Sequence, residues 1–190
     1  MSWKLPGTVI EIQKEEAENL ENLFRPVFLG GGIMLSQVSA ITGLEPYMIQ
    51  NWVKRGFLSN PVQKRYTQSQ LGRILNINTL RSILPMEEIC GLLTYINGQL
   101  DDESDDLIDD AALYFRFVRI AVRLDSGCGR EEREKRIQEG VADYRESVPG
   151  SRKRVEAVLR VMLTAWQSAQ LRREAEELLQ EIRKQKTAAE

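Results

Sequence analysis

The amino-acid sequence predicts a mainly α protein, and three observations carry that prediction. Apolar residues recur at steps of three and four, as in 71–80 and 155–169, which is the period of a helix with one buried face. Helix-start signals stand before other stretches: Pro46 suits a first helical turn, and 67–70 reads as a capping box. Only 57–66, with its Asn-Pro pair and β-favouring residues, suits a small hairpin or an extended loop better than a helix.

The composition excludes several classes of protein. The 190 residues are 42% hydrophobic and 28% charged, which allows one medium core or two small ones and argues against global disorder. Histidine, the commonest general base, is missing. Cys90 and Cys128 alone cannot build a tetrahedral zinc site, so we interpret them as a buried thiol and a loop thiol. Residues 30–32 are three glycines without the Lys and Ser/Thr of a P-loop. We expect no enzyme, no metal and no cofactor.

The sequence also predicts the compartment. The N-terminus MSWKLPGTVIEIQKEE lacks the basic start and apolar run of a signal peptide. No apolar stretch approaches the roughly 18–20 residues that a membrane-spanning helix needs. We expect a cytoplasmic protein with no membrane contact.

Charge is distributed unevenly along the chain. Residues 33–99 have a net charge of +3, whereas 100–110 have a net charge of −7. This pattern indicates a basic module followed by an acidic separator. We predict four parts: an N-terminal helical extension, the basic module, an acidic linker and an all-helical domain for dimerisation or sensing, at residues 1–32, 33–98, 99–110 and 111–190.

Two short helices are expected within the basic module. After an amphipathic helix over 8–24, which Pro26 ends, Ser36 is expected to cap a helix over 36–42, and Gly43 to end it. The next helix, 46–55, has two different sides, because successive residues turn by about 100°. The polar residues Tyr47, Gln50, Asn51 and Lys54 share one side, and the apolar residues Met48, Ile49, Trp52 and Val53 share the other. This helix is expected to pack with one side and to present the other.

The second half of the chain is expected to be helical apart from the acidic linker. The run DDESDDLIDD at 101–110 reads as an exposed segment leading into a helix N-terminus. Residues 107–124 are apolar over most of the helix circumference and predict the centre of a second core. A charged helix is expected at about 131–146. The last helix, 152–185, carries two offset apolar series, which leaves both packing within the subunit and a dimer seam open.

The order of helix, tight turn, helix, basic loop and capped helix is that of a winged helix-turn-helix. The stretches LSQVSAITGLEPYMIQNWVKRGFL, KRYTQSQLGRI and LPMEEICGLL occur in the order found in MerR-type regulators. Over residues 34–96 the chain resembles the winged-helix domain of that family. The whole arrangement also resembles a bacterial branch of MerR-like proteins that have a helical C-terminal domain. The resemblance implies a mainly α protein whose N-terminal winged helix-turn-helix has a small β wing, followed by an all-α domain.

This resemblance implies a homodimeric transcriptional regulator that binds double-stranded DNA. Gln50 and Asn51 can read base edges in the major groove, and Tyr47 can contact a phosphate or a thymine methyl. The expected contacts are Ser36, Gln37, Tyr47, Gln50, Asn51, Lys54, Arg55, Lys64, Arg65 and Tyr66. Tyr66 is expected either to pack the base of the wing or to reach a phosphate. The resemblance implies no particular small-molecule effector.

A second hypothesis keeps the fold but replaces DNA with a protein partner. The wing is shorter than is usual in the family, and Gln50 stands where the family has an arginine. In this hypothesis the Tyr47–Lys54 face contacts a protein, and the acidic segment 101–110 provides a second contact.

Overall fold

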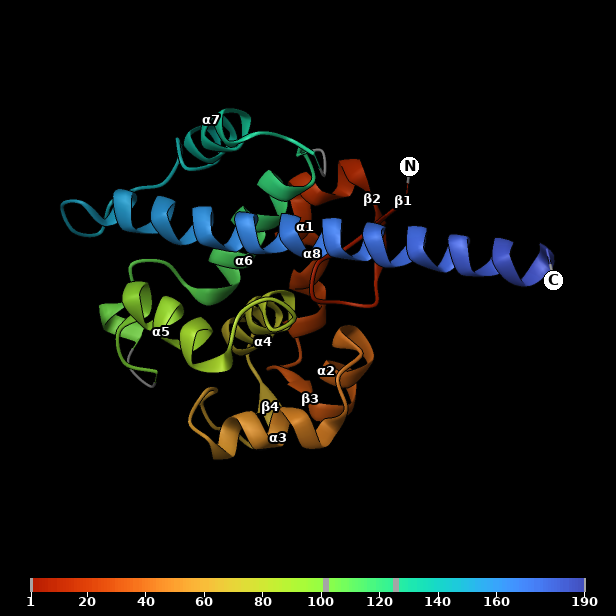
Figure 1. The fold of residues 1–190 in the computed structure, drawn as a ribbon. Helices are drawn as coiled ribbons and strands as arrows, with labels where there is room; N and C mark the ends of the chain where they lie inside the picture. The colour runs from red at the N-terminus through yellow and green to blue at the C-terminus, as the bar shows by residue number, and fades with distance from the viewer. Residues whose placement is uncertain (1, 101–102, 125–126, 190) are drawn as a thin grey trace.

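The structure is a computed structural model that describes residues 2–100, 103–124 and 127–189, and it is mainly helical, as predicted (Figure 1). The α-helices are α1 Leu20–Phe24, α2 Leu35–Thr42, α3 Pro46–Lys54, α4 Gln68–Leu80, α5 Met86–Asn97, α6 Asp110–Ala121, α7 Arg130–Gly140 and α8 Ser151–Ala189. Short 3-10 helices are η1 Lys14–Asn19, η2 Arg25–Phe28 and η3 Glu103–Asp105. Strand β1, Ser2–Lys4, pairs antiparallel with β2, Glu11–Gln13, and β3, Ile33–Met34, pairs antiparallel with β4, Arg65–Tyr66.

The prediction of a helix over 8–24 is wrong for most of that range. The segment forms the second strand of a hairpin, then η1, and only its last residues are α-helical. Gly7, with φ of +72°, allows the tight turn, and the amide of Leu5 donates to the carbonyl of Ile10 at 3.0 Å. Leu5 and Ile12 are buried. Burial against the rest of the chain therefore outweighs the local helical period.

The start of α2 also differs from the prediction. The capping residue is Met34, whose amide donates to Oε1 of Gln37 at 2.8 Å, and Ser36 lies inside the first turn. Pairing of β3 fixes Met34 in an extended conformation, and the helix therefore starts at Leu35, earlier in the chain than predicted. The predicted end is confirmed, because Gly43 has φ of +70° at the C-terminus of α2. Pro46 is the first residue of α3, as predicted.

Residues 57–66 contain a tight turn rather than a complete hairpin. The strand partner of β4 is β3, which lies about thirty residues earlier in the chain. Val62 and Arg65 form an isolated antiparallel bridge around Gln63 and Lys64. These two residues have φ of +50° and +62°, the left-handed pair of a type I′ turn. The turn holds Lys64 at its tip.

Helix α4 lies at the centre of the molecule. Its predicted capping box is confirmed: the Gln70 amide donates to Oγ1 of Thr67 at 3.1 Å, and the Thr67 amide donates to Oε1 of Gln70 at 3.0 Å. The predicted apolar positions from Leu71 to Leu80 are buried. At Gly72, a Cβ atom would lie 2.4 Å from Cα of Ala111. The backbones of α4 and α6 therefore meet directly at this glycine.

One core joins the N-terminal, central and C-terminal segments. Phe24 lies 5.8 Å from Phe115 between ring centroids, and the hydroxyl of Tyr114 donates to the carbonyl of Pro6 at 2.6 Å. Buried side chains run continuously from Leu5 to Trp166. Packing therefore crosses the predicted boundaries between the four parts, and α6, which was expected at the centre of a second core, belongs to this one.

The acidic run is only partly an exposed linker. Asp101 and Asp102 lie outside the described residues. Asp109 accepts hydrogen bonds from the amides of the first turn of α6, so the prediction of an acidic helix start is confirmed. Asp110, however, is buried and forms an ion pair with Arg73 at 3.0 Å. The prediction of exposure fails at Asp110 because a buried arginine compensates its charge.

The C-terminal helices are shifted relative to their predicted bounds. Helix α6 begins three residues later than expected, at Asp110, and α7 ends at Gly140 instead of about 146. In α8 the first apolar series is largely buried in the subunit, whereas Leu171, Leu178 and Ile182 of the second series are 50%, 55% and 63% exposed. The end of α8 projects beyond the other elements (Figure 1). No helix in the described ranges is long and apolar enough to cross a bilayer.

Candidate functional site

Helix α3 has the two sides that the sequence predicts. Ile49 and Trp52 of the predicted apolar side are buried, whereas Met48 and Val53 are half-buried. Tyr47 is 68% exposed, and Gln50, Asn51 and Lys54 are exposed as well. The helix therefore presents two amides, a phenol and an ammonium group to solvent from one rigid element.

A hollow of about 510 Å³ lies beside this exposed face. Three predicted contact residues that are exposed line it from different elements: Ser36 from α2, Gln50 from α3 and Lys64 from the tip of the turn before β4. Its other lining residues are Met34, Leu35, Val53, Pro61 and Tyr66. Residues that are distant in the sequence thus form one concave surface, which we call the α3 face together with Tyr47, Asn51 and Lys54.

The predicted cations of the α3 face are not equivalent. Lys54 and Lys64 are exposed and form no ion pair within the described part of the chain. Arg55 pairs with Glu87 at 3.0 Å, and its guanidinium lies 4.5 Å from the ring centroid of Phe57. Arg65 donates from Nη1 to the carbonyl of Gly32 at 2.9 Å. The two lysines are directly available to a ligand, whereas the two arginines would have to exchange partners.

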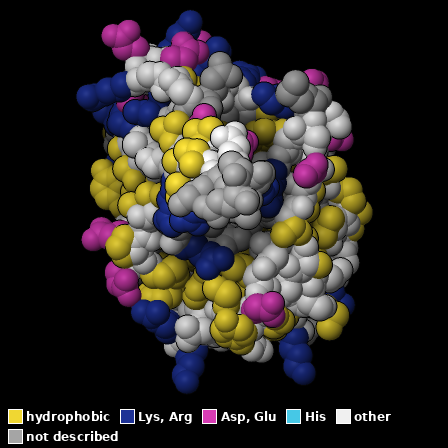
Figure 2. Space-filling model, turned by 45° about the vertical axis from the view of Figure 1, so that its right-hand side comes forward, with side chains coloured by type: hydrophobic (Ala, Val, Ile, Leu, Met, Phe, Trp, Pro, Cys, Tyr) yellow, Lys and Arg dark blue, Asp and Glu magenta, His cyan; other side chains and the backbone are white. Residues whose placement is uncertain are grey.

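Figure 2 shows Lys and Arg side chains projecting from the lower end of the molecule, the end at which Figure 1 places α3. The only carboxylates from the basic module are Glu45, Glu87 and Glu88. Glu87 is already paired with Arg55. The lower end therefore keeps the positive character that the sequence predicts.

Two predicted contacts have structural roles. Tyr66 is 3% exposed, and burial raises the pKa of its hydroxyl. It is packed in the core next to the turn at 62–65 and does not lie on the exposed surface, which agrees with the packing role and not with the phosphate contact among its two expected roles. Gln37 is exposed, but its side-chain oxygen caps α2.

Two polar side chains of α4, Gln70 and Arg73, hold the segment that connects α3 to the turn at 62–65. Nε2 of Gln70 donates to the carbonyls of Ser59 and Asn60, both at 3.1 Å. Nε of Arg73 donates to the carbonyl of Phe57 at 2.9 Å. These bonds fix the segment between α3 and the turn that carries Lys64. The sequence signal was present as polar residues inside an otherwise apolar helix.

The same helix links distant parts of the chain. Arg73 and Asp110 form an ion pair in which the side chains are 7% and 9% exposed. Burial raises the pKa of Asp110, and the nearby Arg73 guanidinium opposes that rise. Nδ2 of Asn78 donates to the carbonyl of Gly7 at 2.8 Å and to that of Thr42 at 3.1 Å. The end of α2 is thereby tied to the N-terminal hairpin.

The cysteines are free thiols, as expected, and lie on different elements. Sγ of Cys128 is 2.8 Å from Nε2 of Gln167. Cys90 is half-buried in α5, and burial raises the pKa of its thiol. A raised pKa disfavours the reactive thiolate.

Comparisons with known proteins match the segment that carries the α3 face. Residues 32–117 match the family described as "Domain of unknown function (DUF1836)". The chain is similar to "Uncharacterized protein YkrK" of Bacillus subtilis (strain 168), with 33% identity over 86 residues, or 43% of this chain and 37% of that protein. The chain therefore spans little more than a third of the curated relative. No solved structure matches it.

The family match includes the two side chains that hold the segment between α3 and the turn at 62–65. It runs from β3 through α2, α3, β4, α4 and α5 into α6. Arg73 and its partner Asp110 both lie inside it. The matched segment thus crosses the predicted acidic linker and ends within the helix that packs on α4.

Proposed function

We propose that this protein is a DNA-binding transcriptional regulator of the MerR-like type. Residues 33–98 act as a winged helix-turn-helix, with α3 as the recognition helix and the turn at 62–65 as the wing. The observation that supports this most is the α3 face, where Ser36, Gln50 and Lys64 line one hollow beside an exposed polar helix. We expect this role to be non-enzymatic and cytoplasmic.

The α3 face fits the chemistry of a DNA duplex. An α-helix fits the major groove, and Gln or Asn can make paired hydrogen bonds to adenine. Gln50 and Asn51 offer this pairing, and Tyr47 can contact a thymine methyl or a phosphate. Lys54 and Lys64 can contact phosphates on either side, which sets affinity without reading sequence.

Affinity requires two copies of the chain. A protomer with two free lysines makes few phosphate contacts, so it binds weakly, whereas a dimer doubles those contacts. The second apolar series of α8 provides a seam: Leu171, Ala175, Leu178 and Ile182 are exposed and follow steps of four and three, which suit a coiled coil. We propose a homodimer through this end of α8.

Two substitutions on the α3 face separate base reading from phosphate binding. Gln50→Ala should weaken binding to the preferred duplex by about 1–3 kcal/mol and leave a scrambled duplex unaffected. Lys64→Ala should weaken both alike and reduce the salt slope by about one. The preferred duplex is first obtained by selecting bound fragments from random duplex DNA. Fluorescence anisotropy titrations on both duplexes, at two salt concentrations, then measure these effects.

Lys153→Ala is the matched control for these titrations, because Lys153 is exposed on α8, away from the α3 face. Its affinity for both duplexes should equal that of the unmodified protein. If Gln50→Ala lowers the affinity for the preferred and the scrambled duplex equally, base reading by α3 is contradicted.

A second candidate function is a protein-interaction module. Large apolar side chains lie in the α3 face or next to it: Met34, Tyr47 and Val62 are 50%, 68% and 69% exposed. Two of the four expected cations are already engaged. Under this alternative, Lys64→Glu with Arg65→Glu abolishes partner pull-down and leaves nucleic-acid retention unchanged.

A further inference from the structure

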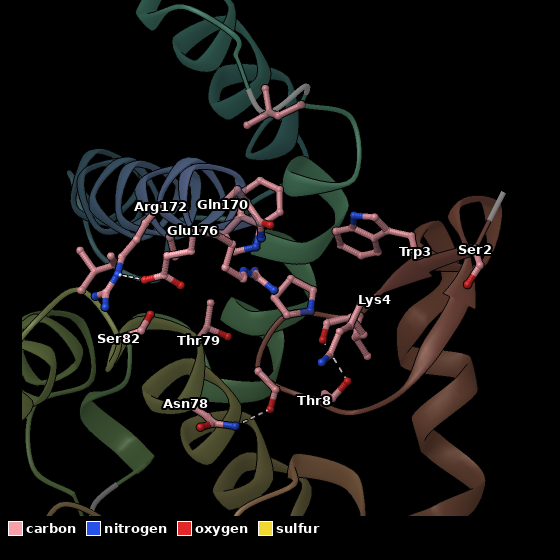
Figure 3. A pocket seen from close by; sticks show the side chains of 18 of the residues that line it. Ser2, Trp3, Lys4, Thr8, Asn78, Thr79, Ser82, Gln170, Arg172 and Glu176 are labelled. Carbon is pink, nitrogen blue, oxygen red and sulfur yellow. Dashed lines mark hydrogen bonds and ion pairs between the residues drawn. The ribbon is translucent and has the colours of Figure 1, made fainter. Parts of the chain in front are cut away.

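A second hollow, of about 940 Å³, shares no lining residue with the hollow of the α3 face. Its walls come from β1 and the following loop, the end of α4, and the middle of α8. In Figure 3, Lys4 from the N-terminal strand, Thr79 from α4 and Gln170 from α8 surround one space. Its volume is within the range of small-molecule pockets, roughly 300–1,000 Å³. We call it the hairpin pocket.

The hairpin pocket concentrates positive charge. Lys4, Lys14, Arg172 and Arg173 line it, and Glu176 is its only carboxylate among the described residues. Arg172 already pairs with Glu176 at 2.9 Å. The other three cations form no ion pair within the described ranges. Residues 1–32 carry five carboxylates and three cations, so this local excess is not inherited from the charge of the segment.

The remaining wall of the hairpin pocket is aromatic and aliphatic. The rings of Trp3 and Trp166 meet edge to face, with centroids 6.4 Å apart. Ile83 and Leu124 add aliphatic surface. Tryptophan offers large apolar contact area together with a hydrogen-bond donor. The pocket thus combines an apolar wall with free cations. This composition suits a ligand that has an apolar part and an anionic group.

We propose that the hairpin pocket binds a small organic anion: a carboxylate or phosphate monoester attached to an aromatic or aliphatic group. Lys4, Lys14 and Arg173 hold the anionic group, since charge-assisted hydrogen bonds are stronger than neutral ones. The hydrocarbon part lies against Trp3 and Trp166. Neither the side chain of Gln170 nor that of Ser82 has a hydrogen-bond partner in the described residues, and both can orient the ligand's polar groups.

The hairpin pocket is mechanically connected to the α3 face. Its loop includes Gly7, whose carbonyl accepts from Asn78, and Asn78 also donates to Thr42 at the end of α2. The amide of Val9 donates to the carbonyl of Ile41 at 3.0 Å. A ligand that orders the loop therefore acts on the segment before the turn into α3. An effect on DNA binding rests on the proposed function, whereas binding of the anion does not.

Calorimetric titration of the full chain tests the proposal without DNA. The probes are 1-naphthyl phosphate, 1-naphthoate, decanoate and decyl phosphate, each with its neutral alcohol. We expect at least one anion to bind saturably at millimolar concentration or below and more tightly than its alcohol. The double substitution Lys4→Gln with Arg173→Gln should lower the affinity for that anion by about tenfold or more.

The control variant is Arg145→Gln with Lys153→Gln, which removes two exposed cations outside the hairpin pocket. It should bind the anion as the unmodified protein does. Far-UV circular dichroism and a thermal melt confirm that each variant is folded. The proposal is overturned if no probe anion saturates at millimolar concentration, if anion and alcohol bind equally, or if both double variants bind alike.

Discussion

Replacing Arg73 with methionine is expected to lower the free energy of unfolding by about 3–5 kcal/mol, because it leaves a buried carboxylate without its countercharge. The guanidinium of Arg73 pairs with Asp110 at 3.0 Å and also donates to the carbonyl of Phe57 at 2.9 Å. Methionine fills similar volume but satisfies neither acceptor. Urea denaturation followed by circular dichroism at neutral pH measures the loss.

Protonation should partly rescue Arg73→Met. Burial raises the folded-state pKa of Asp110 above its ordinary value, and removing Arg73 takes away the charge that opposes this rise. A raised folded-state pKa gives stability that is present below the unfolded pKa and is lost as pH rises through the folded pKa. The difference in the free energy of unfolding between the variant and the unmodified protein should therefore become smaller as pH falls. A difference that does not vary with pH would contradict the role assigned to Asp110.

The matched control is Arg81→Met. Arg81 lies at the exposed end of the same helix and donates only to Asn78 nearby. Surface substitutions of this kind usually change stability by less than about 0.5 kcal/mol. A loss at Arg81 equal to that at Arg73 would assign the effect to the arginine side chain in general and not to the buried ion pair.

Gly72→Ala is expected to destabilise the protein strongly, although alanine is the better helix former. The new Cβ would lie 2.4 Å from both Cα and N of Ala111 and 2.7 Å from the carbonyl carbon of Asp110. All three are backbone atoms, so α4 and α6 must move apart. Overpacking typically costs about 1–3 kcal/mol, and a clash between two backbones falls at the upper end or beyond. Thermal and urea unfolding measure the effect.

Gly91→Ala provides the opposite expectation in the same chain. Gly91 lies in α5, is exposed, and has no atom within 4 Å of a new Cβ. Alanine should stabilise this helix by up to about 1 kcal/mol. The two glycine substitutions should therefore change the free energy of unfolding in opposite directions. A stabilising or neutral effect of Gly72→Ala would show that α4 and α6 do not approach as closely as described.

The sequence predicted the elements whose signals are local. The Thr67–Gln70 capping box, Pro46 at the start of α3 and Gly43 at the end of α2 are as expected, because each depends on a few neighbouring residues. The two sides of α3 followed from helical periodicity alone. Hence the exposed residues of the α3 face were predicted individually.

The sequence did not predict features that depend on distant partners. The 8–24 segment has a helical period, but β1 and the core convert most of it into other structure. In the sequence, Arg73 is one of the cations of the basic module. Its partner in the structure is Asp110, which lies 37 residues away. The bond from Asn78 to Gly7 spans 71 residues. The polar residues inside α4 were a local signal, but nothing near them in the sequence identified the distant groups that they contact.

The most direct test of the proposed function is a salt titration of this chain, residues 1–190, against mixed-sequence duplex DNA, read by fluorescence anisotropy. Binding should appear at low salt, and the logarithm of the binding constant should fall linearly with the logarithm of salt concentration. The magnitude of the slope should be roughly 0.9 for each phosphate contacted. Lys54 and Lys64 should therefore give a slope of about two per protomer. Absence of binding at low salt, with circular dichroism showing folded protein, would contradict DNA binding by this chain.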